Sequence, residues 1–100
     1  MAKTISEQYI ISWPDVDLQD NFTFSVMLPD GRFSFLFKYI NERWNVWCTV
    51  PDGTTREAGA EPNVVNWTGF IDYGLVFASD APEISHDELF NSKLVLIKWA

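Results

Sequence analysis

Apolar side chains alternate with polar ones over most of this 100-residue chain, and this period of two constrains the fold more than any other feature. The alternation runs through residues 22–28 and returns over 33–39 and 44–50. Successive side chains of a strand point to opposite faces of a sheet, so each stretch predicts a half-buried strand. The apolar faces consist of Phe22, Phe24, Val26 and Leu28, then Phe33, Phe35, Phe37 and Tyr39, then Trp44, Val46, Cys48 and Val50.

Two Pro-Asp-Gly turns follow two of these strands, at 29–31 and 51–53. Proline sets φ for the first corner of a type I turn, and glycine takes the positive-φ position that follows. The first turn therefore predicts a hairpin with a bulged three-residue loop. The segment 41–43 is a polar break, and the short polar segment 55–60 predicts an edge strand.

Three further apolar stretches bring the expected number of strands to six or seven. Tyr9, Ile11 and Trp13 align over residues 5–13, and a strand centred on residues 75–77 lies within 70–79. Residues 93–99 are almost continuously apolar, so both faces of that strand should be covered. Residues 59–69 and 81–92 are connections, and the spacing of Ser85 and Glu88 in the second predicts a short capped helix.

Short strands separated by turns about every 8–12 residues predict one all-β domain over residues 1–100. The expected architecture is a small antiparallel sandwich or a partly open barrel, and the pattern leaves the strand order open. The apolar N-terminal segment 1–19 should be held in place, either in the protein's own sheet or on a neighbouring subunit.

The charge balance excludes two classes of partner. Fourteen acidic and seven basic residues give a net charge of −7, which repels phosphate backbones and anionic lipids. Arg32, Lys38, Arg43 and Arg56 cluster on the predicted hairpins, but they are too few for a nucleic-acid footprint. The chain has neither a secretion-signal run nor about 18 consecutive apolar residues, so we expect synthesis in a cytoplasm and no membrane partner.

The residues that normally carry chemistry do not form a recognisable site, and we expect no catalytic, cofactor-binding or metal-binding residues and no enzymatic activity. The single histidine, His86, is interpreted as a solvated loop residue, and Cys48 as a buried, unreactive thiol. The remaining candidates are acidic residues interpreted as solvated: Asp15, Asp17 and Asp20, which lack the glycine and glutamate of a calcium loop, and Glu83, Asp87 and Glu88.

The aromatic content is high, with five Trp, three Tyr and eight Phe. Aromatic residues fill small cores and are enriched at protein interfaces. Those outside the regular alternation are candidates for burial by a partner. The predicted interaction residues are Trp13, Trp67, Phe70 and Trp99. Trp13, Trp47 and Trp67 are also candidate platforms for sugars, although core packing or a protein interface explains the same residues.

The order of the strands and turns is more specific than any single motif. The stretch 22–47 joins an alternating strand, an Asp-Gly turn, an aromatic strand ending in Tyr-x-Asn and a W-x-x-W strand. A second Asp-Gly turn, a Gly-x-x-Pro-type connection at 59–62, a Gly-Leu strand at 74–75, an acidic loop and the closing strand LVLIKW follow. Over about residues 20–99 this order resembles the small baseplate plug proteins of contractile-tailed phages.

The resemblance implies a structural role in the virion, at the central axis of the tail baseplate. The implied partners are the hub, spike and tape-measure proteins, with repeated copies of the chain around a symmetric axis and no cofactor. The chain departs from the family in the longer segment 1–19 and in the more polar connection 60–72. The alternative function is that of a small β-sandwich module that binds carbohydrate or peptide.

Overall fold

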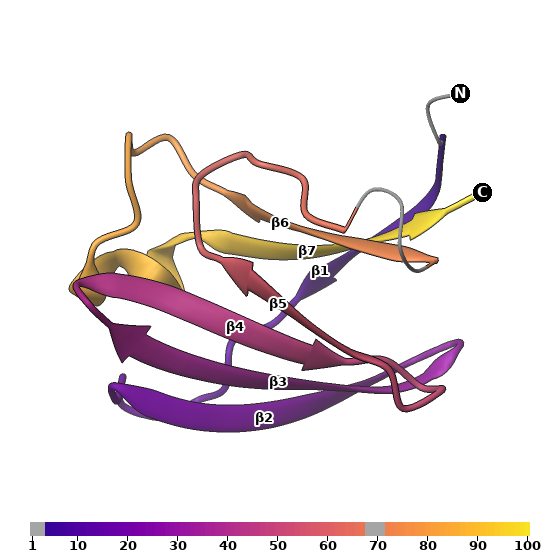
Figure 1. Ribbon diagram of the computed structural model, residues 1–100, viewed down its shortest axis with the longest axis horizontal. Helices are drawn as coiled ribbons and strands as arrows, with labels where there is room; N and C mark the ends of the chain where they lie inside the picture. The colour runs from indigo at the N-terminus through magenta and orange to yellow at the C-terminus, as the bar shows by residue number, and fades with distance from the viewer. Residues whose placement is uncertain (1–3, 68–71) are drawn as a thin grey trace.

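The computed structural model describes residues 4–67 and 72–100, and its regular structure is almost entirely β (Figure 1). Within these residues the chain forms seven strands and one short 3-10 helix. In chain order the elements are β1 (Ile5–Ile11), β2 (Asn21–Leu28), β3 (Gly31–Ile40), β4 (Arg43–Thr49), β5 (Thr55–Gly59), β6 (Tyr73–Ala78), the helix η1 (His86–Asn91) and β7 (Lys93–Trp99).

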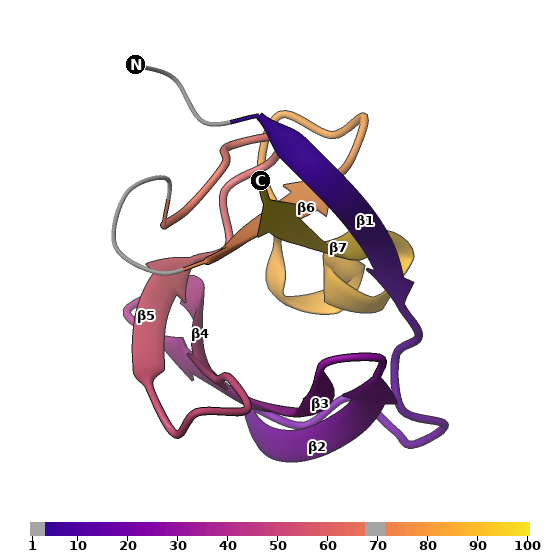
Figure 2. The same cartoon turned by 90° about the vertical axis from the view of Figure 1, so that its right-hand side faces the viewer.

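The strands form two antiparallel sheets. One sheet has the order β1-β7-β6, and the other has the order β2-β3-β4-β5. Figure 2 shows the two sheets facing each other around a common interior. The sheets do not join into a closed barrel, so the prediction of a small antiparallel sandwich is confirmed.

The inward faces are those that the alternation predicts. In β3 and β4, Phe33, Phe35, Phe37, Trp44, Val46 and Cys48 are all at most 2% exposed. The register places Phe35 opposite Cys48 and Phe37 opposite Val46, so apolar side chains neighbour one another across the strands. The inward row of β2, by contrast, is only half-buried, because β2 is the last strand of its sheet.

The three-stranded sheet brings the two ends of the chain together. β7 is its central strand, with β1 on one side and β6 on the other. The four residues from Leu94 to Ile97 are all buried, which confirms the prediction that both faces of this strand are covered. The N-terminal segment therefore takes the first of its two expected positions, because β1 pairs with the protein's own β7.

The turns explain three hairpins. Gly31 and Gly53 have the positive φ expected of the two Pro-Asp-Gly turns, 132° and 93°. The first loop is shorter than predicted, because only two residues separate the paired Leu28 and Gly31 and the register has no bulge. A Cβ at Gly31 would lie 3.1 Å from Pro51, so the two turns also approach each other closely. The polar break between β3 and β4 is a two-residue turn in which Asn41 and Glu42 both have the positive φ of a type I′ hairpin.

The two long connections contain more structure than expected. Pro62 and Asn66 form isolated bridges to β6, so the segment after β5 runs along the outer edge of that strand. The expected helix starts at His86 but is a 3-10 helix, and the Ser85 side chain makes no capping hydrogen bond. The carbonyl of Ser85 instead accepts a hydrogen bond from the Glu88 amide.

Phe37 is the residue that joins most of the interior. It is fully buried, and its ring lies 5.0 Å from Phe22, 5.4 Å from Trp13 and 6.1 Å from Phe77. Phe77 belongs to the opposite sheet, so Phe37 connects the two layers.

We expect Phe37→Ala to lower the free energy of unfolding by about 3–5 kcal/mol, because it leaves a cavity between the sheets. Leu36→Ala, on the outer face of the same strand, should have a much smaller effect. Chemical denaturation of both variants measures the difference. Phe37→Leu provides an intermediate variant if Phe37→Ala does not fold, and equal losses at positions 36 and 37 would contradict this description of the core.

Candidate interaction surfaces

Trp13 lies inside the molecule's own aromatic packing. Its ring centroid is 6.1 Å from that of Phe24, 5.4 Å from Phe37 and 5.2 Å from Phe90. Its indole N–H donates to the carbonyl of Ser92 at 2.8 Å. Trp13 was predicted to be an interaction residue because the alternation of the chain ends there. In the structure its half-buried ring packs against the protein's own core, at the side of the sandwich between β1 and β2.

Trp67 also has an intramolecular role. Its φ is 66°, and its indole N–H donates to the carbonyl of Glu57 in β5 at 2.9 Å. Part of its ring packs against the hydrophobic core. Trp67 thus contacts the edge of β5. Phe70, the other interaction residue predicted in this region, lies outside the described residues.

Trp99 is the predicted residue that lies on the outward side of the three-stranded sheet. A Cβ at Gly74 would lie 2.8 Å from the indole ring of Trp99, so the ring covers the outer side of β6. Its indole nitrogen is buried and has no hydrogen-bond partner among the described residues.

The surface around Trp99 is the outward side of the three-stranded sheet, which we call the outer apolar face. Ile10, Val95 and Val76 form a row across its three strands, and Ile5 lies opposite Trp99. Ile10 is 70% exposed and Ile5 is 47% exposed. The outer apolar face consists of Ile5, Ile10, Val76, Val95, Ile97 and Trp99, with the polar Gln8 among them opposite Ile97. Its β7 residues Val95 and Ile97 are buried, so the exposed part of the face lies along β1. The alternation identifies these residues only once the sheet that contains them is known.

His86 is the centre of a polar cluster that the sequence did not reveal. Its Nε2 atom is 2.5 Å from Asp20 Oδ1, and its Nδ1 atom is 2.7 Å from Asp87 Oδ1. The ring stacks on Trp44 at 5.4 Å and meets the edge of Tyr39 at 4.7 Å. His86 was expected to be solvated, but its side chain is only one-third exposed and contacts two carboxylates and two aromatic rings.

This geometry favours the protonated form of His86. Carboxylates only accept hydrogen bonds, so both ring nitrogens can donate to their carboxylates only when the imidazole carries both protons. The hydrogen bonds to Asp87 and Asp20 accordingly raise the pKa of His86 above its usual value. The charged ring ties η1 to the segment that precedes β2, and Asp20 also accepts the Tyr39 amide through its carbonyl.

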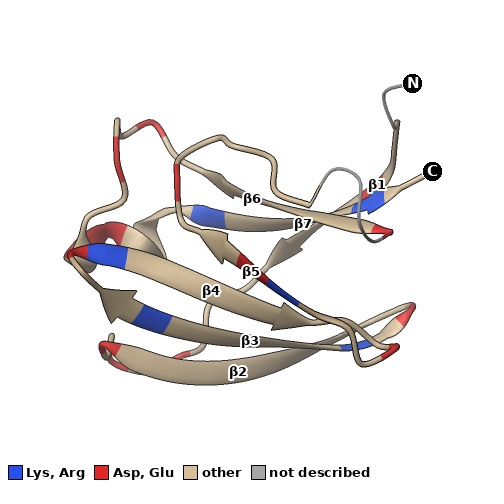
Figure 3. Ribbon diagram, viewed as in Figure 1, with Lys and Arg blue, Asp and Glu red and all other residues tan. Residues whose placement is uncertain are grey.

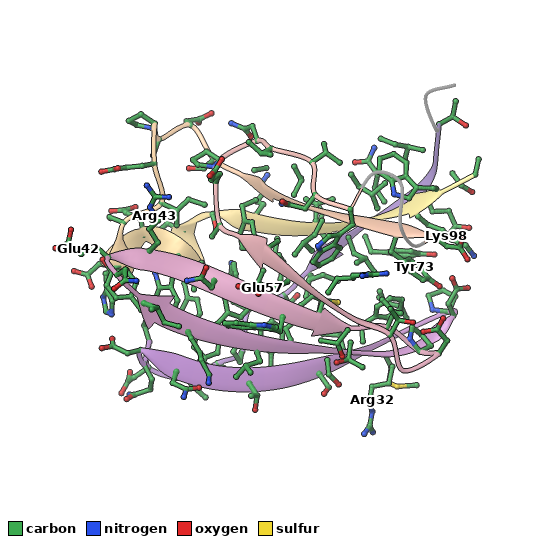
Figure 4. All side chains as sticks on the ribbon, in the orientation of Figure 1. Arg32, Glu42, Arg43, Glu57, Tyr73 and Lys98 are labelled. Atoms are coloured by element: carbon green, nitrogen blue, oxygen red, sulfur yellow. The ribbon has the colours of Figure 1, made fainter. Side chains whose placement is uncertain are left out.

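A second polar cluster holds the two sheets together at the opposite end of the sandwich. Lys98 Nζ is 2.8 Å from Asp30 Oδ2, and the Tyr73 hydroxyl donates to the same oxygen at 2.7 Å. These contacts lower the pKa of Asp30, and burial together with Asp30 raises the pKa of Tyr73 to about 12. In Figure 4, Tyr73 and Lys98 lie close to each other, on the same side as the hairpin turns.

A groove of about 420 Å³ opens where β4 begins and β5 ends. Its rim carries the carboxylates of Glu42, Glu61 and Glu83 and the guanidinium of Arg43, and Figure 3 shows acidic residues on the loops at this end. All three carboxylates are exposed to solvent.

The thiol of Cys48 is fully buried, as the sequence predicted, and burial raises its pKa to about 12. Within residues 4–67 and 72–100, no group of three or more metal-ligating side chains forms. The same residues contain no helix of the length and apolarity that crossing a membrane requires. Comparison of the chain with protein-family models, with curated proteins and with solved structures gives no match.

We expect the pKa of His86, followed through its ring proton resonances by NMR, to lie above its ordinary 6.5. Asp20→Asn should lower it, because the variant keeps a hydrogen-bond acceptor and removes the charge. The raised pKa stabilises the fold fully below about pH 6.5, and this stabilisation disappears as the pH rises through the pKa of the folded state. His86→Ala should abolish that part of the pH dependence, and a His86 pKa at or below 6.5 would contradict the double contact.

Proposed function

We propose that this protein is a structural component of a phage tail baseplate, the central plug that contacts the hub or spike and the tape-measure protein. It acts through protein–protein contacts, in repeated copies around a symmetric axis, and it resides in the virion after synthesis in the host cytoplasm. It uses no cofactor and catalyses no reaction.

The observation that supports this proposal most is the outer apolar face. Its row of Ile10, Val95 and Val76 crosses the whole three-stranded sheet, and Ile10 is 70% exposed. Val95 and Ile97 are already buried, so the apolar area that a protein partner would remove from water is that of the β1 margin, chiefly Ile10 and Ile5. The tryptophan predicted as an interaction residue at the C-terminal end, Trp99, belongs to this face.

The order of strands and turns along the chain is the second support. The resemblance to baseplate plug proteins covers about residues 20–99, and its two Asp-Gly turns lie in the β2-β3 and β4-β5 hairpins. These hairpins make up the four-stranded sheet, whereas the Gly-Leu strand and the closing LVLIKW strand of the resemblance are β6 and β7 of the other sheet. The outer apolar face lies on the other sheet, to which the longer N-terminal segment contributes an edge strand.

The groove at the end of the sandwich favours a second candidate, a module that binds carbohydrate or peptide. Its walls include Pro62 and Pro82, and its rim carries three exposed carboxylates. These groups suit hydroxyl groups or a cationic side chain. A reproducible hit on a glycan or peptide array, lost in Glu61→Ala together with Glu83→Ala, would support this function in place of the first.

Purified virions of the phage that encodes this chain should contain it, and mass spectrometry of their isolated tails is the direct measurement. Its absence from intact virions would end the baseplate proposal.

We expect Ile10→Glu to reduce the amount of the chain in assembled tails by at least about tenfold, because the variant places an unpaired charge on the outer apolar face. The thermal stability of the isolated domain should change little, because Ile10 is exposed. Ile40→Glu is the matched control, since it introduces the same charge at a 44%-exposed isoleucine of the other sheet. Equal incorporation of both variants would exclude the outer apolar face as the contact.

A further inference from the structure

Each sheet of this sandwich has two margins, and three of the four are protected against pairing with another strand. Strand β1 carries Glu7 and a register shift between Ile5 and Glu7. The outer edge of β6 is bridged by Pro62 and Asn66. Strand β5 is short and charged, and the carbonyl of its Glu57 already accepts a hydrogen bond from the Trp67 indole. Charges, bulges, short length and covering segments are the devices by which proteins block strand edges.

The fourth margin, β2, has none of these devices. It runs for eight residues, Asn21–Leu28, with no charged residue and no proline, in a regular register from Asn21 opposite Lys38 to Leu28 opposite Gly31. No other described segment forms a backbone hydrogen bond to its outer edge. In Figure 2, β2 and β5 lie at the two margins of the four-stranded sheet.

The register also identifies the unpaired backbone groups. The Tyr39 amide donates to the Asp20 carbonyl, and the two residues are directly opposite in the register that β2 and β3 share. In an antiparallel ladder, hydrogen-bonded pairs alternate with non-hydrogen-bonded pairs. The even-numbered residues of β2 therefore bond to β3. The residues whose N–H and C=O groups point away from the sheet are Asn21, Thr23, Ser25 and Met27.

We propose that β2 is a docking edge for a second copy of this chain, with the two β2 strands antiparallel about a two-fold axis at Phe24. In this register Asn21 pairs with Met27 and Thr23 with Ser25 of the other copy, so every outward backbone group is used. Phe22 then lies opposite Val26 and Phe24 opposite its own counterpart, and all of these side chains remain on the inward face. The contact is isologous and closes after two copies.

Burial favours a second copy at this edge. Two chains that each carry a net charge of −7 repel each other, and the absence of charged residues in β2 keeps this repulsion smallest where the two strands meet. The inward side chains of β2, from Phe22 to Leu28, are only half-buried, whereas the facing residues Phe33, Phe35 and Phe37 of β3 are buried. An added strand of the same alternation would cover the exposed parts of this row.

This contact does not depend on the proposed function. The two-fold pair forms or fails to form with the isolated chain in solution, whereas membership of a baseplate is decided by the composition of virions. A negative result in one experiment therefore leaves the other proposal standing.

Sedimentation of the purified chain should show a concentration-dependent species of twice the 11.5 kDa of one chain. Concentrations up to about 1 mM should be covered, where even a millimolar dissociation constant populates the pair. Amide hydrogen exchange should slow with concentration at Thr23, Ser25 and Met27. It should stay slow at every concentration at Phe24 and Val26, whose amides bond to β3. A chain that remains monomeric throughout this range would overturn the proposal.

The decisive variants are Ser25→Lys and Ser34→Lys. The two hydroxyl groups share one hydrogen bond of 2.9 Å, so both variants lose the same contact and gain the same charge on the same sheet face. Ser25→Lys, on the edge, should weaken the pair at least tenfold, whereas Ser34→Lys, on the inner strand β3, should leave it intact. Ser25→Pro should also abolish pairing, because it removes an outward N–H that the monomer does not use.

Three results would show that the proposal is wrong. A pair that survives both Ser25 variants forms through another surface. A loss of pairing that is equal in Ser25→Lys and Ser34→Lys shows an effect of charge rather than of the edge. A monomeric chain whose β2 amides become protected only when another protein is added shows that the edge receives a foreign strand.

Discussion

The burial of one row of aromatic side chains between two small sheets is the interaction on which this structure depends. Each sheet buries its apolar face against the other, so the core lies between the three-stranded and the four-stranded sheet. Phe37 contacts rings from its own sheet and from Phe77 in the other, so it is the point at which the layers become one core. Large, rigid side chains make this possible in a chain of 100 residues.

The two polar clusters complete this core at its ends. At one end His86 joins η1 to the start of β2, and at the other Asp30 joins the β2-β3 turn to Lys98 and Tyr73. The net charge alone does not show that the acidic residues of these clusters form ion pairs. In both, a single cation interacts with a carboxylate from a distant part of the chain, so the excess of acid does not prevent closure of the sandwich.

The elements of the fold were predictable because their determinants are local. Alternation identified the inward faces of β2, β3 and β4, and the Pro-Asp-Gly turns identified two of the hairpins. Cys48 could be assigned to the core from its position in that alternation alone.

The surfaces were less predictable because their determinants are not local. Trp13 and Trp67 leave the alternation, yet each is held by a hydrogen bond to a carbonyl far away in the sequence or on another strand. His86 and Asp20 are 66 residues apart, and no pattern in the sequence pairs them. Ile10 and Val95 form one surface only after β1 has paired with β7, which a strand pattern without a strand order does not specify.

The edge strand β2 must be apolar on its inward side to form the core, yet it carries no charged residue that would protect its outer edge. Its inward row of Phe22, Phe24, Val26 and Leu28 is needed for the core, so none of these positions can carry a charge. Its outward positions face solvent and have no such restriction, and a single lysine at Thr23 or Ser25 would block the edge at little cost to the monomer. The β5 margin of the same sheet carries Arg56 and Glu57 in its five residues. Folding of the monomer therefore does not require the neutrality of the outward positions of β2, whereas the contact proposed at this edge does.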